Sequence, residues 1–310
     1  MNFLQAYRTG FGWILKFKRA VFLAYLINLL LVIIPGFVIA DRIQASLGHS
    51  QASLNLVEGY DDLWYKSFSS TARGLASTFH PTLAAEGALW DGLDRFLTGN
   101  LFQVQSGLSY LFALYWLLWI FLSAGFINLF LDREQSLFTG GAIFFFRFLV
   151  LGILAAIIYW LILGKLYPYL NHLMKSFTRE TTDERIIYRY AVIKYAFLWG
   201  LIYLVNIIVD YSKVMMVFEN HRNILKGISA AFKFISKHLK GVLLLYLLTG
   251  LSWLILAFIY GYLAPGIHQS TWSTVLMAFL FSQLYILLRI ATRCWFYSGE
   301  AALVTASTSQ

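Results

Sequence analysis

Cysteine and charge are what this sequence has least of. Its 310 residues include a single cysteine, Cys294, so no disulfide can form within the chain. Only 13% of its residues are charged, whereas soluble domains carry about 25%. The first scarcity excludes a disulfide scaffold and the second excludes a soluble globular enzyme.

Signatures of metal binding and catalysis are missing as well. No Cys-x-x-Cys or His-x-x-x-His pair offers metal ligands, and the six histidines are scattered. The sequence contains no G-x-S-x-G, no phosphate-binding loop and no H-E-x-x-H. We therefore expect no metal, no cofactor and no enzymatic activity.

Apolar residues are abundant instead, at 59% of the chain. A helix needs about 20 such residues to cross roughly 30 Å of hydrocarbon. Six runs meet this need, which predicts an all-α, polytopic membrane bundle of six transmembrane helices. The predicted spans are 20–40, 108–131, 148–166, 191–209, 242–264 and 272–291. The first run is longer than the apolar part of a signal peptide, so we interpret it as an uncleaved span.

Lysine and arginine mark one side of these spans, which predicts cytoplasmic N- and C-termini. The predicted cytoplasmic segments are 1–19, 132–147, 210–241 and 292–310, and the outer ones are 41–107, 167–190 and 265–271. The net charge of +9 is then a matter of topology, and we expect no nucleic-acid partner. The basic residues of 167–190 run against this orientation.

The outer insert, 41–107, carries too many apolar and aromatic residues for a disordered linker. It predicts short amphipathic helices broken at EGY, HPT and TGN, forming either a lid, a docking surface or a structural cap. The insert also holds the side chains that could serve acid–base chemistry at the outer face: Asp61, Asp62, His80, Asp91 and Asp94.

A basic amphipathic pattern follows the fourth span. Apolar residues recur at helical spacing from Ile224 to Leu239, and four lysines occupy the opposite arc: Lys226, Lys233, Lys237 and Lys240. Such a helix is typical of the membrane interface, where anionic headgroups attract lysines. The alternative is a docked structural helix. Residues 1–19 form a less regular version of an interfacial helix.

The order of elements suggests three repeated units, 1–131, 132–209 and 210 to about 295. In each unit an interfacial helix leads into an outward span and a return span. The second unit would begin with the helix 137–148, whose Arg147 suits the headgroup region.

Polar pairs four residues apart end the three return spans, so each pair lies on one helix face. They are Asn128 with Asp132, Asn206 with Asp210, and Arg289 with Arg293. We predict a charge clasp in which Asp210, joined by Asp132, meets Arg289 or Arg293, with hydrogen bonds from both asparagines. Lys213 is the local competitor for Asp210. A proton relay is the alternative, but no acid lies in the middle of a predicted span.

Three stretches carry a resemblance: GGAIFFFRFLVL (140–151), TRETTDER (178–185) and the segment 210–239, which begins DYSK. They resemble a bacterial family of six-span inner-membrane proteins with FFRF and Asp-Tyr-x-Lys…Glu…Arg motifs. The second motif falls on Asp210, Tyr211, Lys213, Glu219 and Arg222, although ENHRN departs from the more acidic family form. The resemblance implies a bacterial inner-membrane location and no activity.

Three functions remain open from the sequence. The first is a non-catalytic scaffold or accessory subunit of a membrane complex, with lipids and other membrane subunits as partners. The second is a carrier or channel for a lipid-like or small solute. It would require a cavity lined by the polar residues of the spans: Asn28, Thr249, Ser252, Ser282 and Gln283. The third is a membrane enzyme acting at the outer face.

Overall fold

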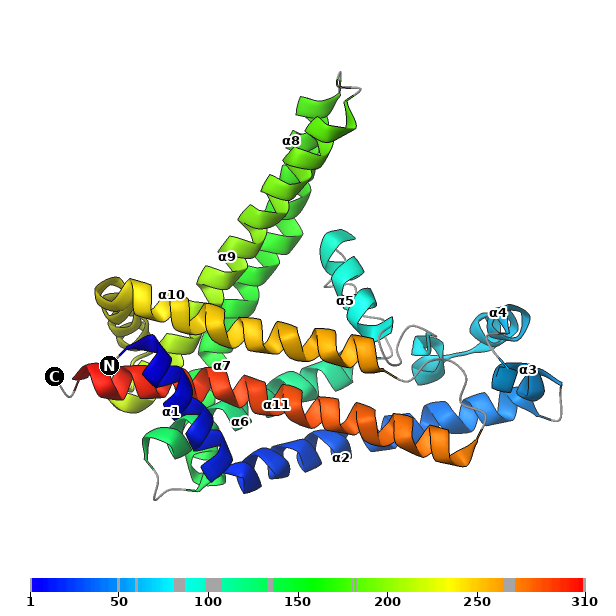
Figure 1. Ribbon diagram of the computed structural model, residues 1–310, viewed down its shortest axis with the longest axis horizontal. Helices are drawn as coiled ribbons and strands as arrows, with labels where there is room; N and C mark the ends of the chain where they lie inside the picture. Colours follow the sequence, from blue (N-terminus) through cyan, green and yellow to red (C-terminus); the bar gives the residue numbers. More distant parts are fainter. Residues whose placement is uncertain are drawn as a thin grey trace.

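The computed structural model describes residues 2–48, 51–58, 61–80, 87–98, 108–132, 136–179, 181, 183–264 and 271–308. All regular secondary structure in these ranges is helical. Six helical segments are long and apolar enough to cross a membrane. The chain is therefore an all-α polytopic bundle, as its hydropathy predicts (Figure 1).

The six spans are built from single helices, with one exception. The single helices are α2 (Lys18–Leu47), α6 (Ser109–Leu131), α9 (Glu184–Phe218), α10 (Ile224–Leu263) and α11 (Trp272–Thr308). The exception is a continuous rod made of α7 (Leu137–Leu161), a π-helical turn η4 (Ile162–Leu166) and α8 (Tyr167–Thr178).

Most of these helices continue well past the predicted hydrocarbon segments. The 37 residues of α11 give a length of about 55 Å at 1.5 Å per residue. Helix therefore makes up much of three segments that the sequence predicts to be interfacial or connecting: 132–147, 167–190 and 210–241. The predicted tail 292–310 is also helical as far as Thr308. An apolar run ends where charged residues begin, but a helix continues until a cap or a left-handed residue ends it. Asn220 (φ 47°) is such a left-handed residue after α9.

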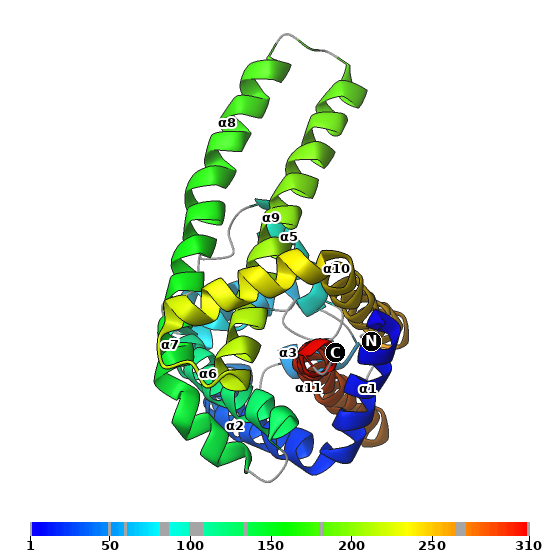
Figure 2. The same ribbon diagram turned by 90° about the vertical axis from the view of Figure 1, so that its left-hand side faces the viewer.

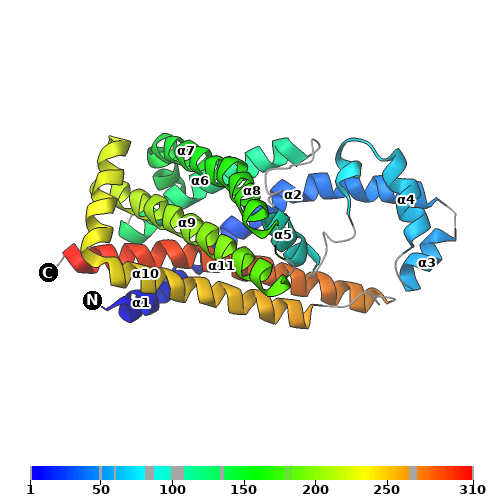
Figure 3. The same ribbon diagram turned by 90° about the horizontal axis from the view of Figure 1, so that it is seen from above.

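Two of the three predicted interfacial helices are set off from their spans by one non-helical residue. Phe17 (φ −100°, ψ 27°) separates α1 (Phe3–Lys16) from α2. His238 (φ −121°, ψ 28°) kinks α10, and the first part of that helix turns across the bundle (Figure 3). The third helix, from Leu137, runs into its span without a break.

The hydrophobic core lies at one end of the bundle, near both termini (Figure 1). There the last turns of α6, α9 and α11 meet α1 and the first turns of α7 and α10, with the end of α11 enclosed by its neighbours (Figure 2). Small residues allow close approach: a Cβ on Gly10 would lie 2.7 Å from the backbone nitrogen of Gly299. We call this region the inner core.

The other ends of the helices are less packed. The α8–α9 hairpin projects from the bundle (Figures 1 and 2). The outer insert forms α3 (Ala52–Glu58), α4 (Asp62–Thr71), the 3-10 helix η1 (Gly74–Thr78) and α5 (Gly87–Thr98). Tyr167 and Tyr195 of the hairpin both donate hydrogen bonds to the carbonyl of Leu97, which holds the end of α5 against the hairpin.

Candidate functional site

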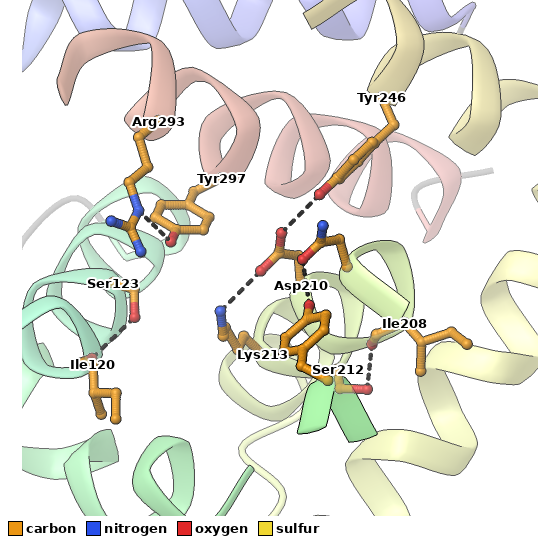
Figure 4. Close-up of polar contacts among 11 residues, drawn as sticks. Ile120, Ser123, Ile208, Asp210, Ser212, Lys213, Tyr246, Arg293 and Tyr297 are labelled. Carbon is orange, nitrogen blue, oxygen red and sulfur yellow. Dashed lines mark hydrogen bonds and ion pairs between the residues drawn. The ribbon is translucent and has the colours of Figure 1, made fainter. Parts of the chain in front are cut away.

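Asp210 lies in the interior of α9, because this helix runs two more turns to Phe218. Lys213, on the same face, donates from Nζ to Asp210 Oδ1 at 2.8 Å (Figure 4). Tyr246 of α10 donates to the other carboxylate oxygen at 3.3 Å. Both side chains of the ion pair are 16% exposed, so most of their charge is shielded from water.

The predicted clasp between Asp210 and an arginine is not formed. Arg293 instead donates from Nε to the hydroxyl of Tyr297 at 3.4 Å (Figure 4). Its guanidinium lies 3.8 Å from the centre of the Trp119 ring. Lys213 lies one turn from Asp210 on the same helix, so their ion pair does not depend on how another helix packs. The local competitor therefore takes the carboxylate.

The remaining members of the predicted pairs are distributed over several helices. Asn206 accepts a hydrogen bond from the hydroxyl of Tyr159 on α7. Asn128 is buried and its side chain occupies the space beside Gly140, so it packs α6 against α7. Asp132 is the exposed C-cap residue of α6. The asparagines thus serve helix contacts, and Asp210 is bonded to Lys213 and not to either arginine of the predicted clasp.

Arg289 and Arg293 both line a cleft of about 690 Å³ between α2, α6, α10 and α11. Its other walls are mainly aromatic and aliphatic, with two amide side chains. The lining residues are Tyr25, Asn28, Leu29, Val32, Tyr115, Trp119, Trp253, Gln283, Ile286, Arg289, Ile290, Arg293 and Phe296. No acid is among them, so the cleft is a positively charged site within an apolar wall.

Two of the five polar residues expected in a cavity lie in this cleft. Asn28 accepts from Trp119 Nε1 at 3.1 Å, and Gln283 accepts from the Tyr25 hydroxyl at 2.9 Å. The other three serve contacts outside it. Thr249 bonds to the Leu245 carbonyl, Ser252 to the Tyr7 hydroxyl, and Ser282 to the Tyr260 hydroxyl.

Glu300 is the functional residue that sequence reasoning missed. It lies on α11 in the segment predicted to be a tail, yet it is 1% exposed. Among the residues that the structure describes, neither of its carboxylate oxygens has a hydrogen-bond partner, and neither does the hydroxyl of the neighbouring fully buried Tyr211. The available signal was an acid within the small and apolar stretch SGEAALV, 298–304.

The lysines of α10 are exposed, as their proposed contact with headgroups requires. We call Lys226, Lys233, Lys237 and Lys240 the basic face. Beside it runs an exposed apolar stripe of Leu225, Phe232 and Leu239, seven residues apart. Gly227, Ala231 and Phe234 on another side are buried in the inner core.

Arg147, which the sequence predicts to lie in the headgroup region, bonds to the turn between α9 and α10. It donates to the Asn220 side chain at 3.3 Å and to the His221 carbonyl at 3.1 Å. Glu219, in the same turn, pairs with His221. This arrangement brings the two motifs of the resemblance, FFRF and the residues after Asp-Tyr-x-Lys, into contact.

No family model, no curated protein and no solved structure matches this chain. The resemblance to a bacterial six-span family therefore stays a prediction.

Proposed function

We propose that this protein binds and carries an anionic, lipid-like molecule in the cleft between α2, α6, α10 and α11. The observation that supports this proposal is a pair of arginines, Arg289 and Arg293, in an otherwise aromatic and aliphatic cleft without an acid. A volume of about 690 Å³ is within the range of small-molecule sites, roughly 300–1,000 Å³.

Charge and shape both favour an amphiphile. Guanidinium groups bind phosphate and carboxylate oxygens with two parallel hydrogen bonds. Arg293 is already oriented by Trp119 and Tyr297, so little side-chain freedom is lost on binding. Leu29 and Val32 of α2 line the cleft, and Val32 is also exposed at the surface, where an acyl chain would lie.

The proposed setting is a bacterial inner membrane with both termini in the cytoplasm. The termini lie at the same end of the molecule as the first part of α10 (Figure 1), and the basic face is exposed there. Positive charge favours the cytoplasmic side. In this orientation the lysines contact anionic headgroups while the apolar stripe beside them enters the interface.

The test is lipid binding by the purified protein, measured by native mass spectrometry with an anionic and a zwitterionic phospholipid. The double variant Arg289→Gln/Arg293→Gln should weaken binding of the anionic lipid at least tenfold, because a hydrogen bond to a charged group contributes about 1.5–3 kcal/mol. Lys175→Gln/Arg179→Gln makes the same change in charge on the exposed hairpin and should bind as the wild type does. Equal binding by both double variants would refute the proposal.

Transport needs its own measurement, since binding alone is compatible with a static lipid site. In proteoliposomes, a carrier moves a fluorescent anionic lipid between leaflets faster than protein-free vesicles do, and the cleft variant should abolish the difference. Binding without movement would reduce the function to that of a lipid-holding protein.

A scaffold or accessory subunit is the second candidate, favoured by the projecting α8–α9 hairpin. Its surface carries exposed aromatic side chains, among them Phe177, Tyr188 and Trp199. Co-purification of a membrane subunit at fixed stoichiometry, lost when Tyr188 and Phe177 are changed to serine, would support this role. A carrier acting alone predicts no such subunit.

Chemistry at the outer face has less support. Asp61 is the N-cap of α4, and hydrogen bonds from the Trp64 backbone and the Asn55 side chain hold its pKa below the usual value, which makes it a poorer base. Asp91 pairs with Arg95 at 2.8 Å. Asp62 pairs with Lys66 at 2.5 Å. Three of the five candidate acid–base residues therefore have structural partners.

A further inference from the structure

The buried carboxyl group of Glu300 is not explained by lipid binding. It lies 28 residues after Trp272, about 42 Å along α11, in the inner core and away from the lipid-facing surfaces. Within the described part of the chain, both of its oxygens lack a hydrogen-bond partner, and so does the hydroxyl of Tyr211. A native structure rarely leaves such groups unsatisfied, and each case calls for a reason.

The charged and titratable groups that interact with Glu300 come from two helices, α9, which also carries Tyr211, and α10. Helix α9 provides Asp210 and Lys213, whose electrostatic interactions with Glu300 are unfavourable and favourable respectively. Helix α10 provides the hydroxyl of Tyr246, bonded to Asp210. The contact of α1 with this part of α11 is made by Gly10, which carries no charge.

The net charge of Asp210, Lys213 and Glu300 together depends on whether Glu300 holds a proton. Lys213 is already bonded to Asp210 at 2.8 Å, so the two charges cancel. An ionised Glu300 would add a negative charge beside a Lys213 already paired with Asp210, and burial of a charge without its own partner is strongly unfavourable. A protonated Glu300 leaves the cluster neutral.

We propose that Glu300 is a proton-binding site, holding its proton in the structure described and releasing it when α11 shifts against α9. On release the O–H bond breaks, the electron pair stays on the carboxylate and the proton passes to water admitted by the movement. The carboxylate then competes with Asp210 for Lys213. Proton release and rearrangement of the Asp210–Lys213 pair are therefore one event.

The same helix connects Glu300 to the cleft. Arg293, Tyr297 and Glu300 are spaced by four and three residues, so they form one column on the face of α11. Arg293 lines the cleft and donates to Tyr297. Lys213 lies 5.6 Å from the Tyr297 ring. A ligand that draws Arg293 into the cleft thus acts on the column that ends at Glu300, a link that rests on the proposed function.

Infrared spectroscopy of the purified full-length protein tests the proton site without any ligand. Wild-type protein at neutral pH should show the C=O stretch of a protonated carboxylic acid, which shifts in D₂O and on labelling with ¹³C-glutamate. The band should be lost in Glu300→Gln and kept in Glu184→Gln, a change of an exposed acid on α9. Absence of the band from the wild type, or its survival in Glu300→Gln, would overturn the proposal.

Glu300→Gln resembles the protonated side chain and should fold. If it does not accumulate, ¹³C-glutamate labelling still decides whether the wild-type band comes from a glutamate, and Tyr211→Phe should move the pH at which that band disappears. An unlabelled origin of the band, or a midpoint unchanged in Tyr211→Phe, would then count against Glu300.

Lipid binding tests the link to the cleft separately. Affinity for the anionic lipid should change with pH in the wild type and become independent of pH in Glu300→Gln. The same pH dependence in both proteins would refute the link. Loss of lipid binding altogether would refute the proposed function, while the infrared result would stand by itself.

Discussion

Lys213 reaches Asp210 from one turn along the same helix, whereas Arg293 comes from another helix and faces the cleft. The choice of Lys213 over Arg293 as the partner of Asp210 affects the stability of the fold as well as ligand binding. A pair whose side chains are 16% exposed has given up most of its hydration, so each charge depends on the other. Breaking such a pair costs more than removing it as a whole.

Single and double variants of this pair should show that asymmetry. Asp210→Asn or Lys213→Met should each lower the free energy of unfolding by about 3–5 kcal/mol, because a buried charge is left without its partner. The double variant Asp210→Asn/Lys213→Met should lose less than the two single losses added together. Denaturant unfolding in detergent measures this, with the exposed Lys226→Met as control. Additive losses would mean that the two charges do not interact.

Sequence patterns could predict which residues of this site are polar and buried near helix ends, but not how they pair. Spacing shows that Asp210 and Lys213 share one face of their helix and that Arg289 and Arg293 share one face of another. Which of these faces meet depends on the rotation of each helix about its axis. That rotation depends on close contacts such as Gly10 with Gly299, which hydropathy does not encode. Glu300 was missed for the same reason, because only packing makes its segment part of the core.

At the scale of elements, hydropathy predicts the six spans and falls short at their ends. The apolar run of α11 ends near residue 291, yet its most enclosed residues come later, at Cys294, Ala301 and Val304. Charged residues leave the hydrocarbon but keep a helical backbone. The inner core therefore combines the inner ends of the predicted spans, such as Phe126 and Phe130 of α6, with helical parts that composition alone assigns to interfacial segments and tails.

The contact between α1 and α11 offers a matched pair of substitutions. Gly10→Ala should lower the free energy of unfolding by about 1–3 kcal/mol, since the new Cβ meets the Gly299 backbone, which cannot move aside as a side chain can. Gly12→Ala, on the same helix with open space around it, should be neutral or should stabilise the protein by up to about 1 kcal/mol. Thermal unfolding of both variants checks this. Equal effects would show that helix propensity, and not packing, governs α1.

At the scale of the whole molecule, the two ends of the bundle differ in construction. The inner core packs six helices around Asp210 and Glu300, whereas the other end consists of the projecting hairpin and the small helices of the outer insert (Figure 1). The proposed shift of α11 against α9 therefore has to rearrange contacts within the packed inner core.

The proposed orientation can be measured because the only cysteine is buried. Cys294 is 0% exposed, so the wild-type protein should react little with a membrane-impermeant maleimide. Ser70→Cys on α4 and Ser236→Cys on α10 put an exposed thiol near opposite ends of the bundle. In spheroplasts Ser70→Cys should be labelled directly, whereas Ser236→Cys should react only after lysis, since the basic face is proposed to be cytoplasmic. The reverse pattern would place the lysines outside and remove their proposed contact with the cytoplasmic leaflet.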